Sequence, residues 1–440
     1  MTAETVLMNR SALAFAADSA VTLTAGGHAK IHNDAEKIFQ LSNTQPIGIM
    51  FYNNAEFNGV PIDVIVREYR NFAPKPDRGF ARLSGAAVHF LYYLRDKYNN
   101  NTHEINYFIS YFSTVISSII DDAQRKLIQL LVMRRNGSKN RTEFNAQKSE
   151  TIFRDTLMQS IKQNIAEYQD VMLKQYLQNL TIEEFKIVYE EKSKNTIDEM
   201  ISYSIFPNLR QDESIKALFF ELAYYVLRSS KKSDLFTGLV FGGFGYEDQF
   251  PRLASVEIDG SQFGKLKIFR QSYTAIDTIH QRAAFRSFAQ TDMTERFLFG
   301  IDESAMNAVR DYVQEALKEV FKLRPRAFSK SEINHLTAKL SNEFSQLMRD
   351  LRDAEEGATL EILAHMSRRQ LADMASALVE LTSTKRRFSP DQETVGGPID
   401  VAVISRNEGF VWVRRKHYFD RNLNPGYEAR LLAAARLGAK

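Results

Sequence analysis

The chain has 440 residues, of which 44% are apolar and 25% are charged, which is typical of a globular protein with a large core. The net charge of +3 is too small to indicate a nucleic-acid-binding face. The absence of cysteine excludes disulfides, thiolate metal sites and a cysteine nucleophile. No apolar run reaches the ~18 residues of a membrane span, and the closest, at 105–120, is predicted to be a buried helix.

The length allows two or three domains, or one domain with large insertions. We expect a cytoplasmic protein with no membrane or nucleic-acid partner. Small residues near position 17 could mimic the cleavage site of an export signal, but Glu4 lies where such a signal would be basic, so export is the less favoured alternative.

Strand formers dominate the first 50 residues. Two consecutive hairpins are predicted, from the runs 5–8 with 12–17 and 37–41 with 47–51. Apolar residues recur at helical spacing from Asn53, which predicts a helix that ends before Pro74, and a second helix is predicted from about 79 to 98.

The rest of the chain alternates between long helical and short strand-rich segments. Residues 101–234 are predicted to be almost entirely helical. A meander follows, with strands in 235–245, 251–260 and 264–271. Further helices are predicted at about 293–323 and within 330–384, then a hairpin in 396–419 that turns at 407–409, and a short terminal helix at 431–437.

Four stretches occur in a particular order: Ala16–Thr22, Lys37–Leu41, Gly242-Gly243 followed by the strand at 251–260, and Gly396-Gly397. Together they resemble the proteasome β-subunit family of N-terminal-nucleophile (Ntn) hydrolases. The resemblance implies an α+β fold, the four-layer αββα sandwich of antiparallel sheets, enlarged here by all-helical insertions. It implies a core of 1–100, 235–325 and 388–425, helical insertions at 101–234 and 326–387, and a C-terminal tail at 426–440.

In that family the nucleophile is the threonine that begins the mature chain, and an Ala-Ala-Asp acid follows sixteen positions later. Counting back sixteen positions from Asp18 reaches Thr2, which removal of Met1 would expose. A free α-amino group, with a pKa of about 7.7–8.0, can take the proton of the adjacent hydroxyl. The resemblance further implies that Lys37 stabilises the alkoxide and that Asp18 orients Lys37.

Each of these residues also has an ordinary structural interpretation. Thr2 is a common second residue, Asp18 suits a turn after a strand, and Lys37 suits the exposed start of a strand. For each residue taken alone the ordinary interpretation is favoured. For the three residues taken together, within the predicted strands, the catalytic interpretation is favoured. Lys37 lies a few residues beyond the family spacing, so Gly26–Asp34 is expected to be a loop that absorbs the extra length.

The sequence departs from the family at three supporting positions. Phe51 and Tyr52 stand where the family has a small residue whose backbone N–H forms the oxyanion hole. Thr291 is the candidate for a hydroxyl that the family places before its third helix. The family's Asp and Ser before Gly396-Gly397 align with Gln392 and Val395, although a shift of one residue would bring Asp391 into place.

The leading hypothesis is a threonine-type Ntn hydrolase, a peptidase within a ring or stacked homo-oligomer. The resemblance implies a peptide or unfolded-protein substrate and an ATP-driven unfoldase partner. No metal or cofactor is expected, because the eight histidines show no paired ligand spacing. Two alternatives remain open: a catalytically inactive scaffold or binding subunit, which the departures favour, and an Ntn hydrolase of small amides.

Overall fold

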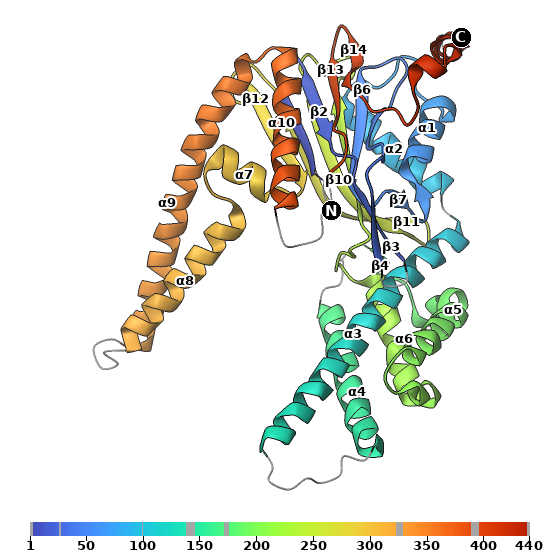
Figure 1. The fold of residues 1–440 in the computed structure, drawn as a ribbon, viewed down its shortest axis with the longest axis vertical. Coiled ribbons are helices and arrows are strands. Elements are labelled where there is room, and N and C mark those ends of the chain that lie inside the picture. The colour runs from blue at the N-terminus through green and yellow to red at the C-terminus, as the bar shows by residue number, and fades with distance from the viewer. Residues whose placement is uncertain are drawn as a thin grey trace.

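The computed structural model describes residues 3–25, 28–98, 100–137, 146–170, 176–322, 329–388 and 396–437. The fold is mixed α/β and is built on antiparallel sheets (Figure 1). The eleven helices of the described part are α1 (Ile62–Phe72), α2 (Leu83–Lys97), α3 (Asn101–Gly137), α4 (Ala146–Asp170), α5 (Ile182–Ser202), α6 (Glu213–Arg228), α7 (Asp292–Phe299), α8 (Glu303–Lys322), α9 (Lys330–His365), α10 (Arg368–Arg387) and α11 (Gly426–Leu437).

Two five-stranded sheets form the centre of the molecule. Sheet 1 contains β1 (Ala3–Asn9), β2 (Leu13–Ala17), β12 (Ala283–Ala289), β13 (Asp400–Ser405) and β14 (Gly409–Arg414), in the order β12-β1-β2-β13-β14. Sheet 2 contains β5 (Ile38–Gln40), β6 (Ile47–Asn53), β9 (Thr237–Gly243), β10 (Arg252–Gln262) and β11 (Lys265–Ala275), in the order β11-β10-β9-β6-β5. Every neighbouring pair of strands is antiparallel. The start of one strand therefore lies beside the end of its neighbour, even where the two strands are far apart in the sequence.

Apolar side chains cover both faces of each sheet, because successive residues of a strand point to opposite faces. In β1, Val6 and Met8 belong to a cluster that also holds Phe15 of sheet 1 and Val240 of sheet 2. Leu7 faces the other way, into a cluster with α10. On the outer face of sheet 2, a separate cluster joins the sheet to α1 and α2.

Small residues allow α10 to lie close to sheet 1. Ala14 and Ala16 of β2 are fully buried in the same cluster as Ala372 and Ala375 of α10. A polar cap begins this helix, since the Ser367 side chain accepts the N–H of Gln370 and the Gln370 side chain bonds back to the Ser367 backbone. The segment 326–387, expected to be an insertion, thus includes a helix that packs directly on the sheet.

Helices α3 to α6 surround an apolar core of their own. Phe112, Phe153, Ile197 and Phe219 are all fully buried in it. These helices extend below the sheets in the view of Figure 1. The apolar segment at 105–120 lies within α3, and no helix in the described ranges has the length and apolarity needed to cross a membrane.

Most strands lie where the sequence predicts them. Both N-terminal hairpins are confirmed as β1–β2 and β5–β6, the meander as β9–β10–β11, and the last hairpin as β13–β14. Strand β12 was not predicted. Its Ala-rich sequence has low intrinsic strand preference, and its pairing with β1 supplies the backbone hydrogen bonds.

Three local predictions are wrong. Residues 28–32, expected in a loop, form β4 (His28–His32), which pairs with β3 (Val21–Ala25). The helix expected from Asn53 begins only at Ile62, because Asn58 and Gly59, with φ of 49° and 77°, turn the chain between β7 (Glu56–Phe57) and β8 (Val60–Pro61). The helix expected over 293–323 is split into α7 and α8 by Gly300, whose φ is 74°.

Candidate active site

Strand ends from both sheets meet where the sequence predicts the site. Antiparallel pairing places Glu4 of β1 and Asp400 of β13 on either side of Ala17, the last residue of β2. Asp18 therefore leaves sheet 1 between these two strands. Lys37 immediately precedes β5, at the edge strand of sheet 2.

Asp18 is buried and accepts hydrogen bonds from four donors. One oxygen, Oδ1, accepts the Ala3 N–H at 3.1 Å and the Lys37 ammonium at 2.6 Å. The other, Oδ2, accepts the backbone N–H groups of Gly396 at 2.9 Å and Ala20 at 3.3 Å. Because three of these donors come from other segments, the carboxylate ties Ala3 of β1, Gly396 and Lys37 together.

Lys37 is among the most buried charged residues of the described chain, with only 1% of its surface exposed. Its ammonium contacts two carboxylates, Asp18 at 2.6 Å and Glu4 Oε1 at 3.5 Å. The ammonium therefore lies between two carboxylates at a site away from water.

Glu4 is the member of the cluster that the sequence analysis missed. It is fully buried and shares the face of β1 that carries Val6 and Met8. The sequence held a signal for this residue. Glu4, Val6 and Met8 are alternate residues of one strand, so their side chains share a face, and that face is apolar at the other two positions. A carboxylate at a core-facing position of a strand is a candidate functional group.

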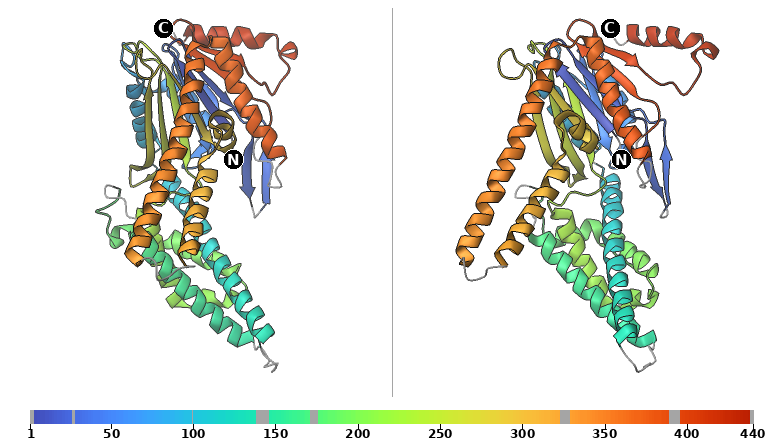
Figure 2. Two further views of the ribbon diagram at one scale, coloured as in Figure 1. Left: turned by 90° about the vertical axis from the view of Figure 1, so that its left-hand side faces the viewer. Right: turned by 60° about the vertical axis from the view of Figure 1, so that its left-hand side comes forward.

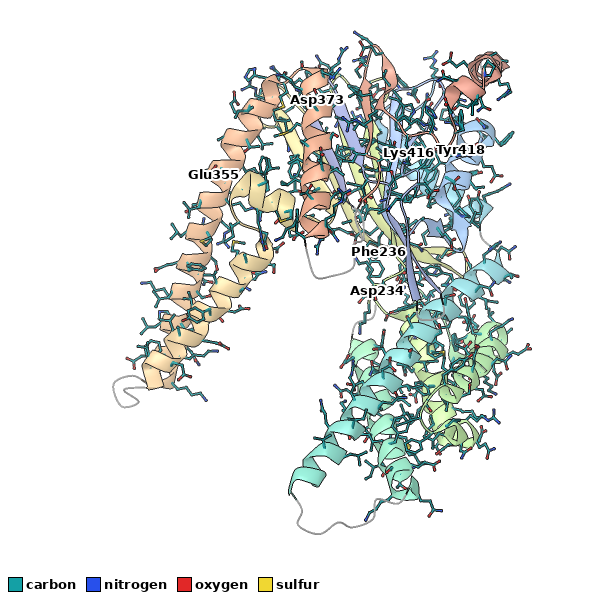
Figure 3. All side chains as sticks on the ribbon, viewed as in Figure 1. Asp234, Phe236, Glu355, Asp373, Lys416 and Tyr418 are labelled. Carbon is teal, nitrogen blue, oxygen red and sulfur yellow. The ribbon has the colours of Figure 1, made fainter. Side chains whose placement is uncertain are left out.

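Tyr52 forms a second polar chain close to this cluster. Its hydroxyl donates to Glu257 Oε1 at 3.0 Å, and Lys232 donates to the other Glu257 oxygen at 2.7 Å. Burial, and then the Glu257 carboxylate, raise the pKa of Tyr52 well above its ordinary value, with a smaller contribution from Glu4. The Tyr52 ring lies against Phe288 and Phe236, and Figure 3 marks Phe236 near the lower end of the sheets.

Of the other predicted residues, the two glycines lie at or beside the cluster, two residues lie outside the described part of the chain, and Phe51 and Thr291 lie at the edges of the site. Gly396 joins the cluster through its bond to Asp18 and accepts the Ser19 N–H at 3.2 Å. Gly397 has a φ of 76°, and a Cβ there would lie 2.7 Å from the Asn33 carbonyl oxygen, so the chain requires glycine. Thr2 and Asp391 lie outside the described residues, as do Gln392 and Val395.

Phe51 and Thr291 lie at the edges of the site. The Phe51 N–H donates to the Lys37 carbonyl at 3.1 Å, so this amide takes part in strand pairing. The Phe51 ring stacks on Phe39. Thr291 immediately precedes α7, and its side chain makes no capping hydrogen bond. It lies two residues beyond Ala289, the partner of Ala3 in sheet 1, at the end of the sheet where β1 begins.

A cleft of about 510 Å³ opens at Glu36, the residue before Lys37, but Glu4, Asp18 and Lys37 do not line it. Its lining includes Ala35, Phe51 and Pro398, together with Lys416 and Tyr418, both marked in Figure 3. The cleft connects to the cluster through Ser19, whose backbone carbonyl accepts the Ala35 N–H at 3.1 Å and whose hydroxyl donates to the Pro398 carbonyl. Its volume lies in the range of small-molecule and peptide-side-chain pockets.

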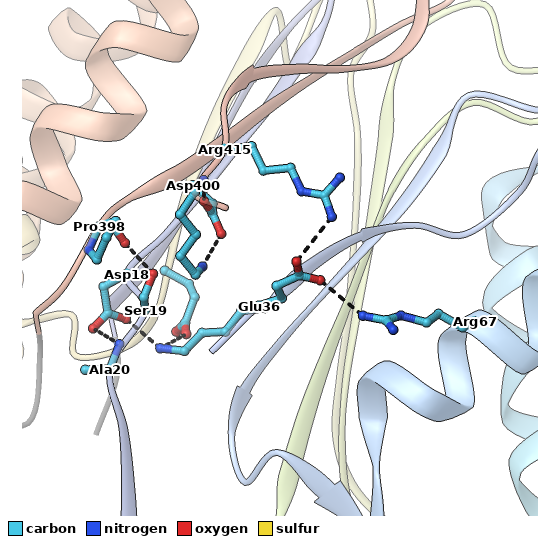
Figure 4. Close-up of polar contacts among 11 residues, drawn as sticks. Asp18, Ser19, Ala20, Glu36, Arg67, Pro398, Asp400 and Arg415 are labelled. Carbon is cyan, nitrogen blue, oxygen red and sulfur yellow. Dashed lines mark hydrogen bonds and ion pairs between the residues drawn. The ribbon is translucent and has the colours of Figure 1, made fainter. Parts of the chain in front are cut away.

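Charged side chains on the cleft wall hold one another in place. Glu36 is bridged by Arg415 at 3.2 Å and Arg67 at 3.4 Å, and Lys416 donates to Asp400 (Figure 4). Within the described residues, no group of three or more His, Asp or Glu side chains could hold a metal ion.

The arrangement provides a buried ammonium, a carboxylate that positions it, and an accessible cleft alongside. Ala3 donates to the same carboxylate oxygen as Lys37, so the first described residue of β1 lies at this cluster. No family model matches the chain, and no curated protein matches it.

Proposed function

We propose that the protein is a threonine-type Ntn hydrolase in which Thr2, exposed by removal of Met1, attacks an amide carbonyl. The observation that carries the proposal is the buried Lys37–Asp18 pair, whose carboxylate also holds the N–H of Ala3, the residue after Thr2. In this proposal the fold is the four-layer αββα sandwich of that family. The apolar cluster between the sheets and the helix-covered clusters outside them support this description.

The proposed reaction needs a proton acceptor, a cation and an acid. The neutral α-amine of Thr2 takes the hydroxyl proton, directly or through water, as the oxygen attacks. The Lys37 ammonium stabilises the negative charge that develops on that oxygen, and it does so strongly because the site is buried. Asp18 keeps the ammonium in place, and the same α-amine then returns the proton to the leaving amine as the C–N bond breaks. Water, deprotonated by the same amine, then hydrolyses the ester between the acyl group and Thr2, and the proton returns to the threonine oxygen.

A polypeptide or unfolded protein is the proposed substrate, bound along the cleft that Glu36 and Phe51 line. We further propose that the enzyme works as a homo-oligomer in the cytoplasm, with an ATP-driven unfoldase supplying the chain. These parts of the proposal come from the family resemblance, and purification of the complex from the native host would test them.

Intact mass spectrometry tests the chemistry. Protein from the native host should lack Met1 and should gain one equivalent of a β-lactone or epoxyketone probe. Thr2→Ala should abolish the adduct, whereas the isosteric control Thr5→Val, in β1, should keep it. An adduct that persists in Thr2→Ala would exclude Thr2 as the nucleophile.

One observation favours a second candidate, a scaffold or binding subunit without catalytic activity. The Phe51 N–H, at the position expected for the oxyanion donor, already bonds to the Lys37 carbonyl. Loss of one such donor costs about 10²–10³ in rate. Retention of Met1 in the mature protein, with no adduct from either probe, would support this candidate.

A further inference from the structure

Helices α8 and α9 form an antiparallel pair that extends away from the two sheets (Figures 1 and 2). The two helices meet along one row of residues on each. At mid-length the Gln314 side chain donates to Ser341 Oγ at 2.7 Å, and Ser341 is buried. In a pair of helices each helix buries only one stripe of side chains against the other. Apolar side chains elsewhere on the pair are buried only if another element covers them.

Each helix carries a second apolar row that faces solvent. On α9 this row contains Leu340, Leu347 and Leu351, with 40%, 56% and 56% of their surface exposed. Their spacings of seven and four residues match the heptad repeat of packed helices. On α8 the row contains Val309, Tyr312 and Val320, exposed by 43%, 71% and 60%.

Both rows lie on the same side of the hairpin. At 3.6 residues per turn, each row is roughly a quarter turn from the row that joins the two helices. On both helices the turn from the contact row to the exposed row is opposite in sense to the rotation of the helix from one residue to the next. Because the helices are antiparallel, the two rotations point to one common face, as in half of a four-helix bundle.

The apolar area of this face suits a second hairpin. Full burial of a Leu-sized side chain removes roughly 100 Å² from water, so the six half-exposed side chains offer about 300 Å². Protein interfaces are a little over half apolar, so each partner would bury on the order of 600 Å². The total of about 1,200 Å² is at the lower end of stable interfaces.

Charge selects the direction in which two such hairpins pair. The stretch 349–356 of α9 holds four acids and two arginines, a net charge of −2, and Figure 3 marks Glu355 within it. The stretch 330–343 holds two lysines and two glutamates, a net charge of zero. An antiparallel arrangement places the negative stretch of each copy opposite the neutral one, whereas a parallel arrangement stacks the two negative stretches.

We propose that the α8–α9 hairpin is a self-association surface, on which the hairpin of a second copy of this chain packs antiparallel to complete a four-helix bundle. Gln314 and Ser341 lie at the same level of the hairpin, so the exposed row of α8 and the exposed row of α9, taken together, have their common centre between Glu343 and Phe344 of α9. Leu340 of each copy then lies opposite the partner's Leu347. The inference does not rest on the proposed catalytic function, since it uses no residue of the candidate site.

Sedimentation velocity on the full chain tests the surface. We expect a dimer or a larger even-numbered assembly at about 1–100 µM, the range suited to an interface of this size. Leu347→Glu with Leu351→Glu should weaken association at least ~100-fold, because two charges would be buried at the interface. The control Ile187→Glu changes a side chain of α5 that is 85% exposed and should leave association unchanged.

The absence of cysteine in the chain allows a test of the register. A mixture of Leu340→Cys and Leu347→Cys proteins should be joined by a short thiol crosslinker. Either variant alone should not crosslink, because equivalent positions would lie about 10 Å apart along the helix. A wild-type monomer throughout the range, a dimer that tolerates both glutamates, or equal crosslinking of the single variants would overturn the proposal.

Discussion

Replacement of Lys37 by methionine isolates the buried charge at the candidate site, because methionine has a similar length but no charge. At an effective dielectric constant of about 20, the attraction of the ammonium to Asp18 across 2.6 Å is about 6 kcal/mol, and that to Glu4 across 3.5 Å about 5 kcal/mol. Desolvation offsets much of this in the wild type. The substitution takes away the ammonium that both buried carboxylates contact, so we expect a loss of about 3–5 kcal/mol in the free energy of unfolding.

Urea denaturation at pH 7 measures this loss. The control Lys232→Met removes a lysine that is one-third exposed, also paired to a carboxylate at 2.7 Å, and should cost about 1 kcal/mol or less. Glu4→Gln in the Lys37→Met background should recover about 1–2 kcal/mol, since it removes the repulsion between the two carboxylates.

The result that would refute the reasoning is an equal cost for Lys37→Met and Lys232→Met. The two carboxylates would then have to be compensated without Lys37. An absence of recovery in the double variant would show that Glu4 does not share the charge of Lys37.

Two further predictions concern Tyr52 and the buried tyrosines. Gly238→Ala should lower the free energy of unfolding by about 1–3 kcal/mol, because the added Cβ would lie 2.1 Å from the Tyr52 ring. The control Gly357→Ala in α9, where the added Cβ has nothing within 4 Å, should be neutral or slightly stabilising. Equal unfolding midpoints for the two variants would contradict this prediction. Several buried tyrosines have pKa values raised mainly by burial, so above pH ~10 the unfolded chain loses phenolic protons that the native state keeps, and the free energy of unfolding falls by up to ~1.4 kcal/mol per pH unit for each. They are Tyr52, Tyr69, Tyr111, Tyr176 and Tyr189. Absorbance of the phenolates should therefore rise together with loss of far-UV circular dichroism, and ionisation of all tyrosines near pH 10 in a protein that stays folded would argue against it.

Local patterns in the sequence predicted most of the secondary structure. The hairpins β1–β2 and β13–β14 follow from strand-forming runs around short turns. Pairing of Asp18 with Lys37 was also predicted, but from the family resemblance and not from any local pattern. Local signals failed where a turn interrupted a helical pattern, as at Asn58, and where a strand drew its stability from a distant partner, as in β12.

Glu4 shows why the site itself could be predicted only in part. Its position in a strand indicates which residues share its face, but not what lies opposite that face. Lys37 is 33 positions away and immediately precedes a strand of the other sheet, so their contact depends on how the two sheets pack. The contact of Gly396 with Asp18, across 378 positions, has the same origin.

The sequence by itself determined which segments are strands or helices and which residues could carry chemistry, because backbone preference and apolar periodicity act over a few neighbouring residues. Only the tertiary structure decided that an ammonium and two carboxylates share one dry site, and that two apolar rows of a helical hairpin point the same way. Both arrangements arise from the packing of elements that are distant in the chain, where burial and distance set the strength of each interaction.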